Sequence, residues 1–254
     1  MGKVIAIANQ KGGVGKTTTA INLCAALTNT GAHVLLCDMD PQGNATSGVG
    51  VDKNKAEPNM YNVLIQGINP EDVIVKTQYG DVLPANKILS GAGVELVVTQ
   101  NREYVLKNVL AQIRDKYKFI LIDCPPSLEM LTLNSLCAAD TVLIPVQCEY
   151  FALEGLSDLM SSIRMIKKSL NTSLDIEGVL LTMYDSRTNF SAQVAAEIKK
   201  FFNRKVYTVS IPRNIRLAEA PSHGQPIIDY DKSSRGSIAY MELAKELIKR
   251  NRSS

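Results

Sequence analysis

A glycine-rich turn near the N-terminus constrains the fold more than any other stretch of the sequence. It occupies residues 9–18 and reads N-Q-K-G-G-V-G-K-T-T. The apolar run V-I-A-I-A at residues 4–8 precedes it and predicts a buried strand, and the amphipathic run at residues 19–27 follows it and predicts a helix. The chain is therefore expected to pass from a strand into a helix through a turn that permits unusual backbone angles.

The turn has the residue types that a loop needs to bind phosphate. Gly12, Gly13 and Gly15 permit backbone angles at which consecutive N–H groups converge on one anion. The helix that begins near Lys16 adds its unpaired N–H groups and the positive end of its dipole. Lys16 supplies a full charge for the β- and γ-phosphates, and the Thr17 hydroxyl is placed to ligate Mg²⁺ directly. This order of elements is that of the phosphate-binding loop of nucleotide hydrolases.

One position departs from the usual loop pattern. The pattern G-x-x-x-x-G-K-[ST] requires glycine at position 10, where this chain has Gln10, and an extra lysine, Lys11, follows it. Lys11 stands at the far end of the loop from Lys16, so the sequence predicts a second cation close to the γ-phosphate. The predicted triphosphate site comprises Lys11, Gly12, Gly13, Val14, Gly15, Lys16, Thr17 and Thr18.

Strand-like and helix-like runs alternate along the rest of the chain. The expected strands are residues 3–8, 33–38, 119–123, 141–146, 177–183 and 206–211, with a further strand over 81–84. The expected helices include residues 17–28, 103–116, 155–170 and 191–202. Near-continuous Val/Ile/Leu strands separated by helices predict an α/β fold, doubly wound, with a mostly parallel sheet and helices on both faces. The absence of repeats, low-complexity tracts and linkers predicts a single domain over residues 1–254.

Carboxylates follow two of the predicted strands where each strand ends. Parallel sheets bind ligands at the carboxyl ends of their strands, so Asp38, Asp40 and Asp123 are expected near the bound phosphates. Asp123 follows four apolar residues, which is the Walker B arrangement, and would hold Mg²⁺ through a water molecule. Asp38 is a second candidate for the outer shell of the magnesium. Asp40, beyond the strand end, is better placed to orient the attacking water.

Composition excludes several other classes of protein. No stretch of about 18 apolar residues occurs, and the N-terminus runs straight into the first strand, so neither a membrane span nor a signal peptide is expected. The cysteines are odd in number and never form C-x-x-C, which is typical of reduced, mostly buried thiols in a cytoplasmic protein. They are Cys24, Cys37, Cys124, Cys137 and Cys148.

Charge is distributed unevenly along the chain. The formal net charge is +3, but residues 185–254 carry 13 Lys/Arg and 7 Asp/Glu, a balance of +6, and residues 1–184 carry 15 and 18, a balance of −3. The basic C-terminal part is a candidate surface for binding a polyanion. Ordinary solvated helices would give the same balance, so charge alone does not decide between the two interpretations.

Together these motifs resemble the deviant Walker A ATPases, and most closely the ParA/Soj family of chromosome- and plasmid-partitioning ATPases. The resemblance covers nearly the whole chain and rests on five strings. They are K-G-G-V-G-K-T-T at 11–18, D-M-D-P-Q-G-N at 38–44, F-I-L-I-D-C-P-P-S at 119–127, P-V-Q-C-E-Y-F-A-L-E-G-L at 145–156 and I-P-R-N-I-R-L-A-E-A-P-S-H-G at 211–224. The absence of an N-terminal extension resembles the short members, which lack a separate operator-binding domain.

The resemblance implies a role for several single residues. Lys11 is similar to the signature lysine of the family, which crosses the dimer interface to the phosphates held by the other subunit; a cation there would stabilise the charge on the transferring phosphoryl group. Lys11, Lys16 and Asp40 would then be the catalytic residues, with ATP and Mg²⁺ as cofactors. Pro212 and Asn214 fall where the family contacts adenine, and Met183 is expected nearby.

The resemblance also implies binding to DNA. Arg187 and Arg216 match positions that the family uses for binding double-stranded DNA without regard to sequence. Four further cations are expected to extend that patch, namely Lys199, Lys200, Arg204 and Lys205. Contacts of this kind go to phosphate, carry no sequence information and weaken steeply with salt.

The resemblance therefore implies an ATP-dependent homodimer that binds DNA and is released when a DNA-bound activator of the ParB type stimulates hydrolysis. Such a protein would be cytoplasmic and associated with the nucleoid.

A membrane-cycling ATPase resembling MinD is the alternative, because residues 237–250 are amphipathic, with Ile238, Met241, Ala244 and Ile248 on one face. The tail lacks Phe, Trp or Leu, so this helix is expected to pack on its own sheet instead of inserting into a membrane. An iron–sulfur reductase resembling the nitrogenase iron protein is disfavoured, because Cys124 and Cys137 are not spaced as cluster ligands.

Overall fold

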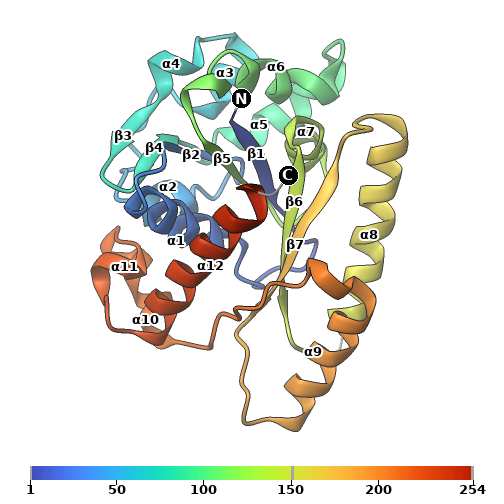
Figure 1. Ribbon diagram of the computed structural model, residues 1–254. Helices are drawn as coiled ribbons and strands as arrows, with labels where there is room; N and C mark the ends of the chain where they lie inside the picture. The colour runs from blue at the N-terminus through green and yellow to red at the C-terminus, as the bar shows by residue number, and fades with distance from the viewer. Residues whose placement is uncertain (1, 150–151, 253–254) are drawn as a thin grey trace.

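The computed structural model describes residues 2–149 and 152–252. In this part of the chain seven strands form one sheet in the order β3-β4-β2-β5-β1-β6-β7 (Figure 1). The strands are β1 (Lys3–Ile7), β2 (Val34–Asp38), β3 (Val75–Thr77), β4 (Gly80–Leu83), β5 (Phe119–Asp123), β6 (Thr141–Gln147) and β7 (Asp175–Thr182). All neighbouring pairs are parallel except β3 and β4, which form an antiparallel hairpin at one edge. The prediction of a doubly wound, mostly parallel sheet is confirmed.

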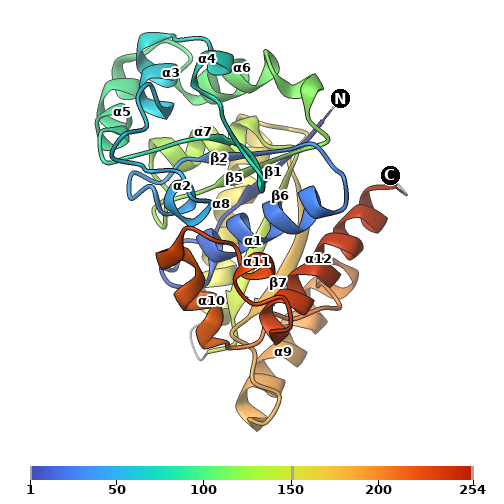
Figure 2. The same ribbon diagram turned by 90° about the vertical axis from the view of Figure 1, so that its left-hand side faces the viewer.

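Two hydrophobic cores cover the two faces of this sheet. Every residue of β2 and β5 is buried, as expected for central parallel strands that are apolar on both sides. One core joins the sheet to α3, α5, α6, α7, α8 and α9, and the other joins it to α1, α2, α10, α11 and α12 (Figure 2). The longer of these helices are α1 (Lys16–Asn29), α7 (Met130–Ala138), α8 (Ala152–Ser169), α9 (Asn189–Phe202) and α12 (Arg235–Arg252). The shorter are α2 (Asn44–Gly48), α3 (Met60–Gln66), α4 (Pro70–Val73), α5 (Leu89–Glu95), α6 (Val105–Ala111), α10 (Ile215–Glu219) and α11 (Ile227–Tyr230).

The strand predicted over residues 206–211 does not form. The segment runs beside β7 and bonds to it only at intervals: the Tyr207 N–H donates to the Val179 carbonyl and the Ile211 N–H to the Leu181 carbonyl. The N–H groups of Thr208 and Val209 donate instead to the Glu246 carboxylate of α12. The ladder is therefore interrupted, because a side chain satisfies the backbone donors that a regular strand would place in the sheet.

The single helix predicted over residues 103–116 is also wrong. The segment divides into a 3₁₀ turn at Arg102–Tyr104, the helix α6 and a second 3₁₀ turn at Arg114–Lys116. Asn134 of α7 accepts a hydrogen bond from the Leu106 N–H at 3.1 Å, and this contact fixes where α6 begins. Helical periodicity in the sequence does not reveal such a contact from a distant helix.

The C-terminal helix packs against its own domain surface, as predicted. In α12 the buried residues are Gly236, Ser237, Ala239, Tyr240, Leu243, Ala244 and Leu247. The apolar face predicted from the sequence is wrong in part, because Ile238 is 56% exposed. Helix α12 lies along α1, where the Tyr240 hydroxyl is 3.2 Å from the hydroxyl of Thr19. Among the described residues, no helix combines the length and the hydropathy that spanning a bilayer requires.

Candidate functional site

The glycine-rich turn connects β1 to α1 in the conformation that a phosphate-binding loop requires. Gly13 (φ +75°) and Gly15 (φ +88°) lie in the left-handed region, whereas Gly12 does not. Gly15 is also the residue that precedes α1, so the first helical N–H groups point out of the loop without a capping side chain. A Cβ atom built on Gly12 or Gly13 would meet nothing within 4 Å. The loop therefore has open space beside both glycines.

Hydrogen bonds to β6 and β7 hold the loop in place. The Asn9 amide donates to the Pro145 carbonyl of β6 at 2.7 Å, and its oxygen accepts from the Lys11 N–H at 3.0 Å. The Thr182 hydroxyl of β7 donates to the Val14 carbonyl at 2.8 Å. These contacts fix the loop before any ligand arrives, which reduces the entropy that binding must remove.

Lys16 lies inside the loop with its charge largely removed from water. The residue is 6% exposed, and its Nζ donates to the Lys11 carbonyl at 3.1 Å. Burial lowers the pKa of Lys16, and the nearby Asp123, Cys124 and Asp40 act in the opposite direction. A buried ammonium group with so few partners is well suited to bind an anion.

The two strand-end carboxylates predicted to serve magnesium lie side by side. β2 and β5 are parallel neighbours, and Asp38 is in register with Asp123. Both side chains are fully buried. Asp38 accepts from the N–H and hydroxyl of Thr46, at 2.8 and 2.7 Å, and from the Asp40 N–H at 3.1 Å. Burial nevertheless raises the pKa of Asp38 to about 6, against the effect of these hydrogen bonds.

Asp123 differs from Asp38 because its carboxylate is left without partners. Within residues 2–149 and 152–252 neither of its oxygens makes a hydrogen bond. Burial, followed by the charge of Asp38, raises the pKa of Asp123 well above its ordinary range; the Thr17 hydroxyl and Lys16 lie close enough to lower it somewhat. A buried carboxylate without a partner is costly unless a cation or its water shell joins it.

A hydrated magnesium ion fits this arrangement. The described residues contain no cluster of three or more His, Cys, Asp or Glu side chains that would bind a metal alone. Mg²⁺ commonly keeps several waters and uses one or two protein groups together with substrate phosphates. Thr17 at the start of α1 would supply a direct ligand, and Asp38 and Asp123 would accept hydrogen bonds from the waters of the ion.

The residues predicted to contact adenine meet in one cavity of about 350 Å³ beside the loop. Its walls are formed by Gly15, Thr18, Thr182, Met183, Ile211, Pro212, Arg213, Asn214, Ile215, Leu217, Ala218 and Tyr240. Met183, Pro212 and Asn214 thus come together with the end of the phosphate loop. Met183 has a positive φ of +49°, which is uncommon for a residue other than glycine and turns the chain out of β7. Asn214 also caps α10 by accepting from the Arg216 N–H at 2.8 Å.

Lys11 lies at the edge of the loop with its ammonium group turned to its own chain. Its Nζ makes an ion pair with Glu149, at 3.0 Å, beyond the end of β6. Both side chains are partly exposed, 37% for Lys11 and 47% for Glu149, so the ion pair is screened and weak. Asp40 is half-buried just after β2, and its carboxylate accepts from the Gln42 N–H at 2.9 Å.

The predicted DNA-binding residues lie on several elements. Arg187 follows β7, and Arg216 lies in α10, whose first residue, Ile215, lines the same cavity as Gly15 of the phosphate loop. Helix α9, whose 14 residues span about 21 Å, separates Arg187 from Arg204 and Lys205. Lys205 is engaged at the opposite end of β7, where its Nζ pairs with Asp175 at 2.9 Å.

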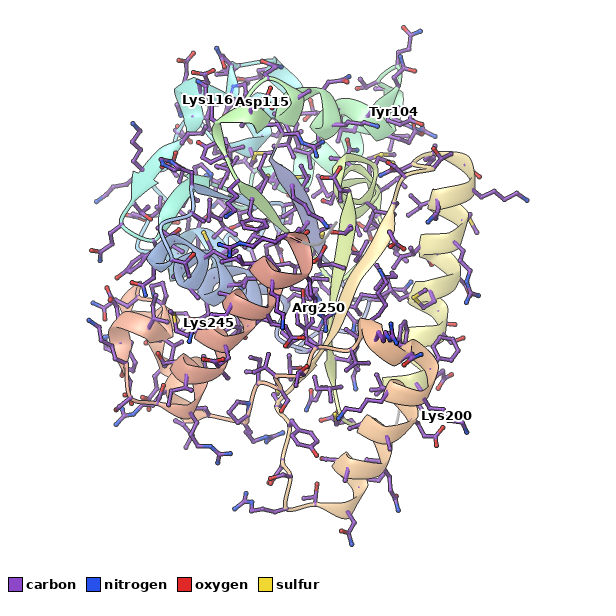
Figure 3. The ribbon with its side chains drawn as sticks, viewed as in Figure 1. Tyr104, Asp115, Lys116, Lys200, Lys245 and Arg250 are labelled. Atoms are coloured by element: carbon purple, nitrogen blue, oxygen red, sulfur yellow. The ribbon has the colours of Figure 1, made fainter. Side chains whose placement is uncertain are left out.

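The remaining cations of this group lie late in α9. Lys199 and Lys200 are exposed near the C-terminal end of the helix, and Figure 3 shows Lys200 there, away from Arg250 on α12. That these cations extend a patch around Arg187 and Arg216 stays a prediction.

Sequence reasoning missed two residues that shape the site. Thr182 fixes the loop, and Thr46 links Asp38 to the Ala85 N–H, which donates to its hydroxyl at 2.9 Å. Both are single threonines outside the motifs above, and only the fold shows that Thr182 ends β7 beside the loop and that Thr46, in α2, reaches Asp38. The five cysteines, by contrast, are all buried as predicted, and no disulfide links them.

Comparison with known proteins agrees with this geometry. A family described as "AAA domain" matches residues 2–176. The chain is 57% identical to the sporulation initiation inhibitor protein Soj of Bacillus subtilis, over 97% of this chain and 98% of that protein. It is 51% identical to the chromosome partitioning protein ParA of Caulobacter vibrioides, over 98% of this chain and 95% of that protein.

Solved structures show the same fold. A protein of Mycobacterium smegmatis described as cobyrinic acid a,c-diamide synthase, with bound ATP analogue and magnesium, superposes with a TM-score of 0.88 at 38% identity, over 100% of this chain and 97% of that chain. The cell division ATPase MinD of Pyrococcus furiosus superposes with a TM-score of 0.79 at 29% identity, over 98% of this chain and 99% of that chain. With the full-length identity to Soj and ParA, these likenesses show that the chain belongs to the ParA/Soj family of chromosome-partitioning ATPases.

Proposed function

We propose that this protein is an ATP-controlled switch for DNA segregation: it pairs when it binds ATP, and the pair holds DNA without regard to sequence. The observation that carries the proposal is the preformed phosphate loop with two lysines, Lys16 buried within it and Lys11 at its rim. The second lysine is not needed to bind a triphosphate within one chain. It is free to serve a triphosphate bound by another copy once it leaves Glu149.

The residues around the loop have separate tasks in this proposal. The N–H groups from Gly12 to Thr17 and the Lys16 ammonium hold the β- and γ-phosphates. Met183, Pro212 and Asn214 hold the adenine in the adjoining cavity. Asp40, near Lys16 but outside the strand, orients the water that attacks the γ-phosphate. The Lys11 ammonium of a second copy stabilises the negative charge that develops on the transferring group.

Magnesium supplies the neutralising charge on the β- and γ-phosphate oxygens when it is bound. The chain would hold the ion through the Thr17 hydroxyl, and would hold its water shell through Asp38 and Asp123. The partnerless oxygens of Asp123 are what make that assignment reasonable. Hydrolysis would remove the γ-phosphate that joins the two copies, so the pair would come apart.

DNA binding would depend on pairing because each copy offers only a few phosphate contacts. Arg187 and Arg216 supply the charge, and two copies double the number of contacts and therefore steepen the dependence on salt. A DNA-bound activator of the ParB type would stimulate hydrolysis and so release the dimer from DNA. The partner would also supply the choice of DNA site, since phosphate contacts carry no sequence information.

A binding experiment with matched variants tests the proposal. DNA binding by the wild-type protein should require ATP or a slowly hydrolysed analogue and should weaken steeply between about 50 and 200 mM salt. The Lys11→Ala variant should bind ATP but not pair, and it should lose most of its DNA affinity. DNA binding that ignores both nucleotide and salt would contradict the proposal. Pelleting with liposomes in an ATP-dependent manner would favour a membrane-cycling ATPase instead.

A further inference from the structure

The two arginines assigned to DNA are each held by a carboxylate of the same chain. Arg187 donates through Nε and Nη2 to the two oxygens of Asp185, at 2.9 and 2.8 Å. Arg216 donates through Nη1 to Glu219 at 2.9 Å, and its Nε lies 3.9 Å from Asp231. The two pairs lie on different elements, the loop after β7 and the helix α10.

The geometry of the first pair matters because phosphate uses the same donors. A guanidinium group forms two parallel hydrogen bonds to a carboxylate or to a phosphate in the same forked manner. Arg187 is 87% exposed, so its guanidinium group can reach a phosphate from solvent, whereas the Asp185 side chain is 31% exposed. A phosphate that binds Arg187 through the same fork must therefore displace Asp185.

We propose that Asp185 and Glu219 compete with DNA phosphate for Arg187 and Arg216, and so hold the affinity of the paired form for DNA below the value that the arginines alone would give. This inference rests on the proposed function, because it assigns a role to carboxylates beside the proposed DNA contacts. The ligand is the phosphate backbone of duplex DNA, and the competition is independent of base sequence.

Such competition would favour release. An exposed ion pair changes an equilibrium by about 1.4- to fivefold. A pair of protein copies carries each ion pair twice, so removal of one kind of carboxylate should tighten DNA binding by about two- to 25-fold in the dimer. A single copy carries the ion pair once, so its DNA affinity would rise by only about 1.4- to fivefold. The carboxylates therefore reduce DNA affinity more in the dimer than in the monomer, and they keep the dimer able to dissociate.

Asp185→Asn is a clean test because asparagine keeps the local turn. The Asp185 Oδ1 accepts from the Arg187 N–H at 3.0 Å, and an asparagine oxygen can accept the same hydrogen bond. Only the charge is removed. A substitution of Glu219 would be a less selective test, because its Oε2 also accepts a hydrogen bond from the Tyr230 hydroxyl at 3.3 Å.

The experiment is a double-mutant cycle on the full-length protein locked with a slowly hydrolysed ATP analogue. Wild type, Asp185→Asn, Arg187→Ala and the double variant are titrated with a fluorescent duplex of random sequence, at several salt concentrations. Asp185→Asn should tighten binding by about two- to 25-fold, Arg187→Ala should weaken it, and Asp185→Asn should have no effect once Arg187 is absent. Asp72→Asn, which removes one exposed charge from α4 on a distant part of the molecule, is the matched control and should change little.

Several results would overturn the inference. If Asp185→Asn weakens binding or leaves it unchanged while Arg187→Ala weakens it, Asp185 orients the arginine or is neutral, but the proposed DNA site survives. An equal gain with and without Arg187, or in Asp72→Asn, would mean that net charge alone acts. If Arg187→Ala binds DNA as the wild type does, the role of Arg187 and the competition both fail. Sedimentation of the same proteins with ATP then shows separately whether ATP-dependent pairing holds.

Discussion

The phosphate loop and the arginines proposed to bind DNA lie at the same end of the sheet but differ in construction. The loop is held by hydrogen bonds from Asn9 and Thr182. Lys16 and the neighbouring carboxylates are buried. The arginines are exposed and paired with acids close to them in sequence. The loop therefore has its geometry before the ligand arrives, whereas the arginines must exchange one partner for another.

This difference matters for how tightly each surface can bind. Charges in a buried, fixed site interact through a low dielectric, and their side chains lose little conformational entropy on binding. Single residues there therefore have large effects. Charges on the exposed surface are screened by salt and already satisfied, so each carries a small effect and many must act together. The nucleotide is thus expected to control the state of the protein, and DNA is expected to be held weakly and released readily.

The largest effect should come from Lys16→Ala. Removing the one buried cation of the loop should weaken ATP binding by at least about a hundredfold, because the phosphates would no longer have a charge-assisted hydrogen bond in a desolvated site. Isothermal calorimetry with Mg²⁺ and ATP measures this change. The matched control is Lys55→Ala, at an exposed lysine outside the loop, which should bind ATP normally. Near-normal ATP binding by Lys16→Ala would remove the main distinction between the two regions.

A second prediction separates binding from hydrolysis. Asp40→Ala should bind ATP and pair, but its hydrolysis rate should fall by about a hundredfold or more, because an oriented general base or water-positioning group contributes that much. A phosphate-release assay measures the rate, and sedimentation checks the pairing. If hydrolysis in Asp40→Ala stayed within a factor of two of the wild type, another group would have to position the water.

A third prediction concerns the pH dependence that buried Asp38 imposes. Its pKa is raised from 3.8 to about 6, so the folded state binds the proton more tightly than the unfolded state. Its contribution to stability is therefore present below about pH 4 and is lost as pH rises to about 6, a change of about 3 kcal/mol for a shift of this size. Urea unfolding of wild type and Asp38→Asn at pH 4.5 and 7 measures about 2 kcal/mol of this change as a difference between the two proteins.

The direction of that difference is fixed. Relative to Asp38→Asn, the wild-type protein should become less stable as pH rises, and Mg²⁺ with nucleotide should remove much of the deficit by neutralising the carboxylates. A stability difference that does not change between the two pH values would show that Asp38 does not titrate in this range in the folded protein.

The smallest effect should be that of Arg187→Ala. DNA binding by the ATP-bound dimer should weaken by roughly tenfold, and the slope of log affinity against log salt should fall by about one for each arginine–phosphate interaction removed. Anisotropy titrations over a range of salt give both numbers. Lys76→Ala, at an exposed lysine of the edge hairpin, is the control and should leave the slope unchanged.

The same comparison explains what sequence could predict. The loop, β1, β5 and the two strand-end carboxylates were predictable because each is a local pattern: glycines at fixed spacing, continuous apolar runs and an acid directly after them. The parallel sheet was predictable because strand-like and helix-like runs alternate along the chain. The adenine cavity depended on the family resemblance, because Met183 and Pro212 lie on segments that only the fold brings together.

The sequence predictions that were wrong concern places where contacts between distant segments decide the structure. The strand over 206–211 does not form because Glu246 takes two of its N–H groups, and the helix over 103–116 is divided where Asn134 caps α6. Lys205 pairs with Asp175 at the far end of β7 from Arg187, a separation that a count of charges along the chain cannot show. Surface arrangement is thus less predictable than the buried site.

The most direct test of the central claim is analytical ultracentrifugation of wild type and Lys11→Ala with ADP and with a slowly hydrolysed ATP analogue. The claim predicts that the wild type pairs with the analogue and stays single with ADP. Lys11→Ala should stay single with both, although calorimetry shows that it binds the analogue. A Lys11→Ala protein that pairs as strongly as the wild type would contradict the account.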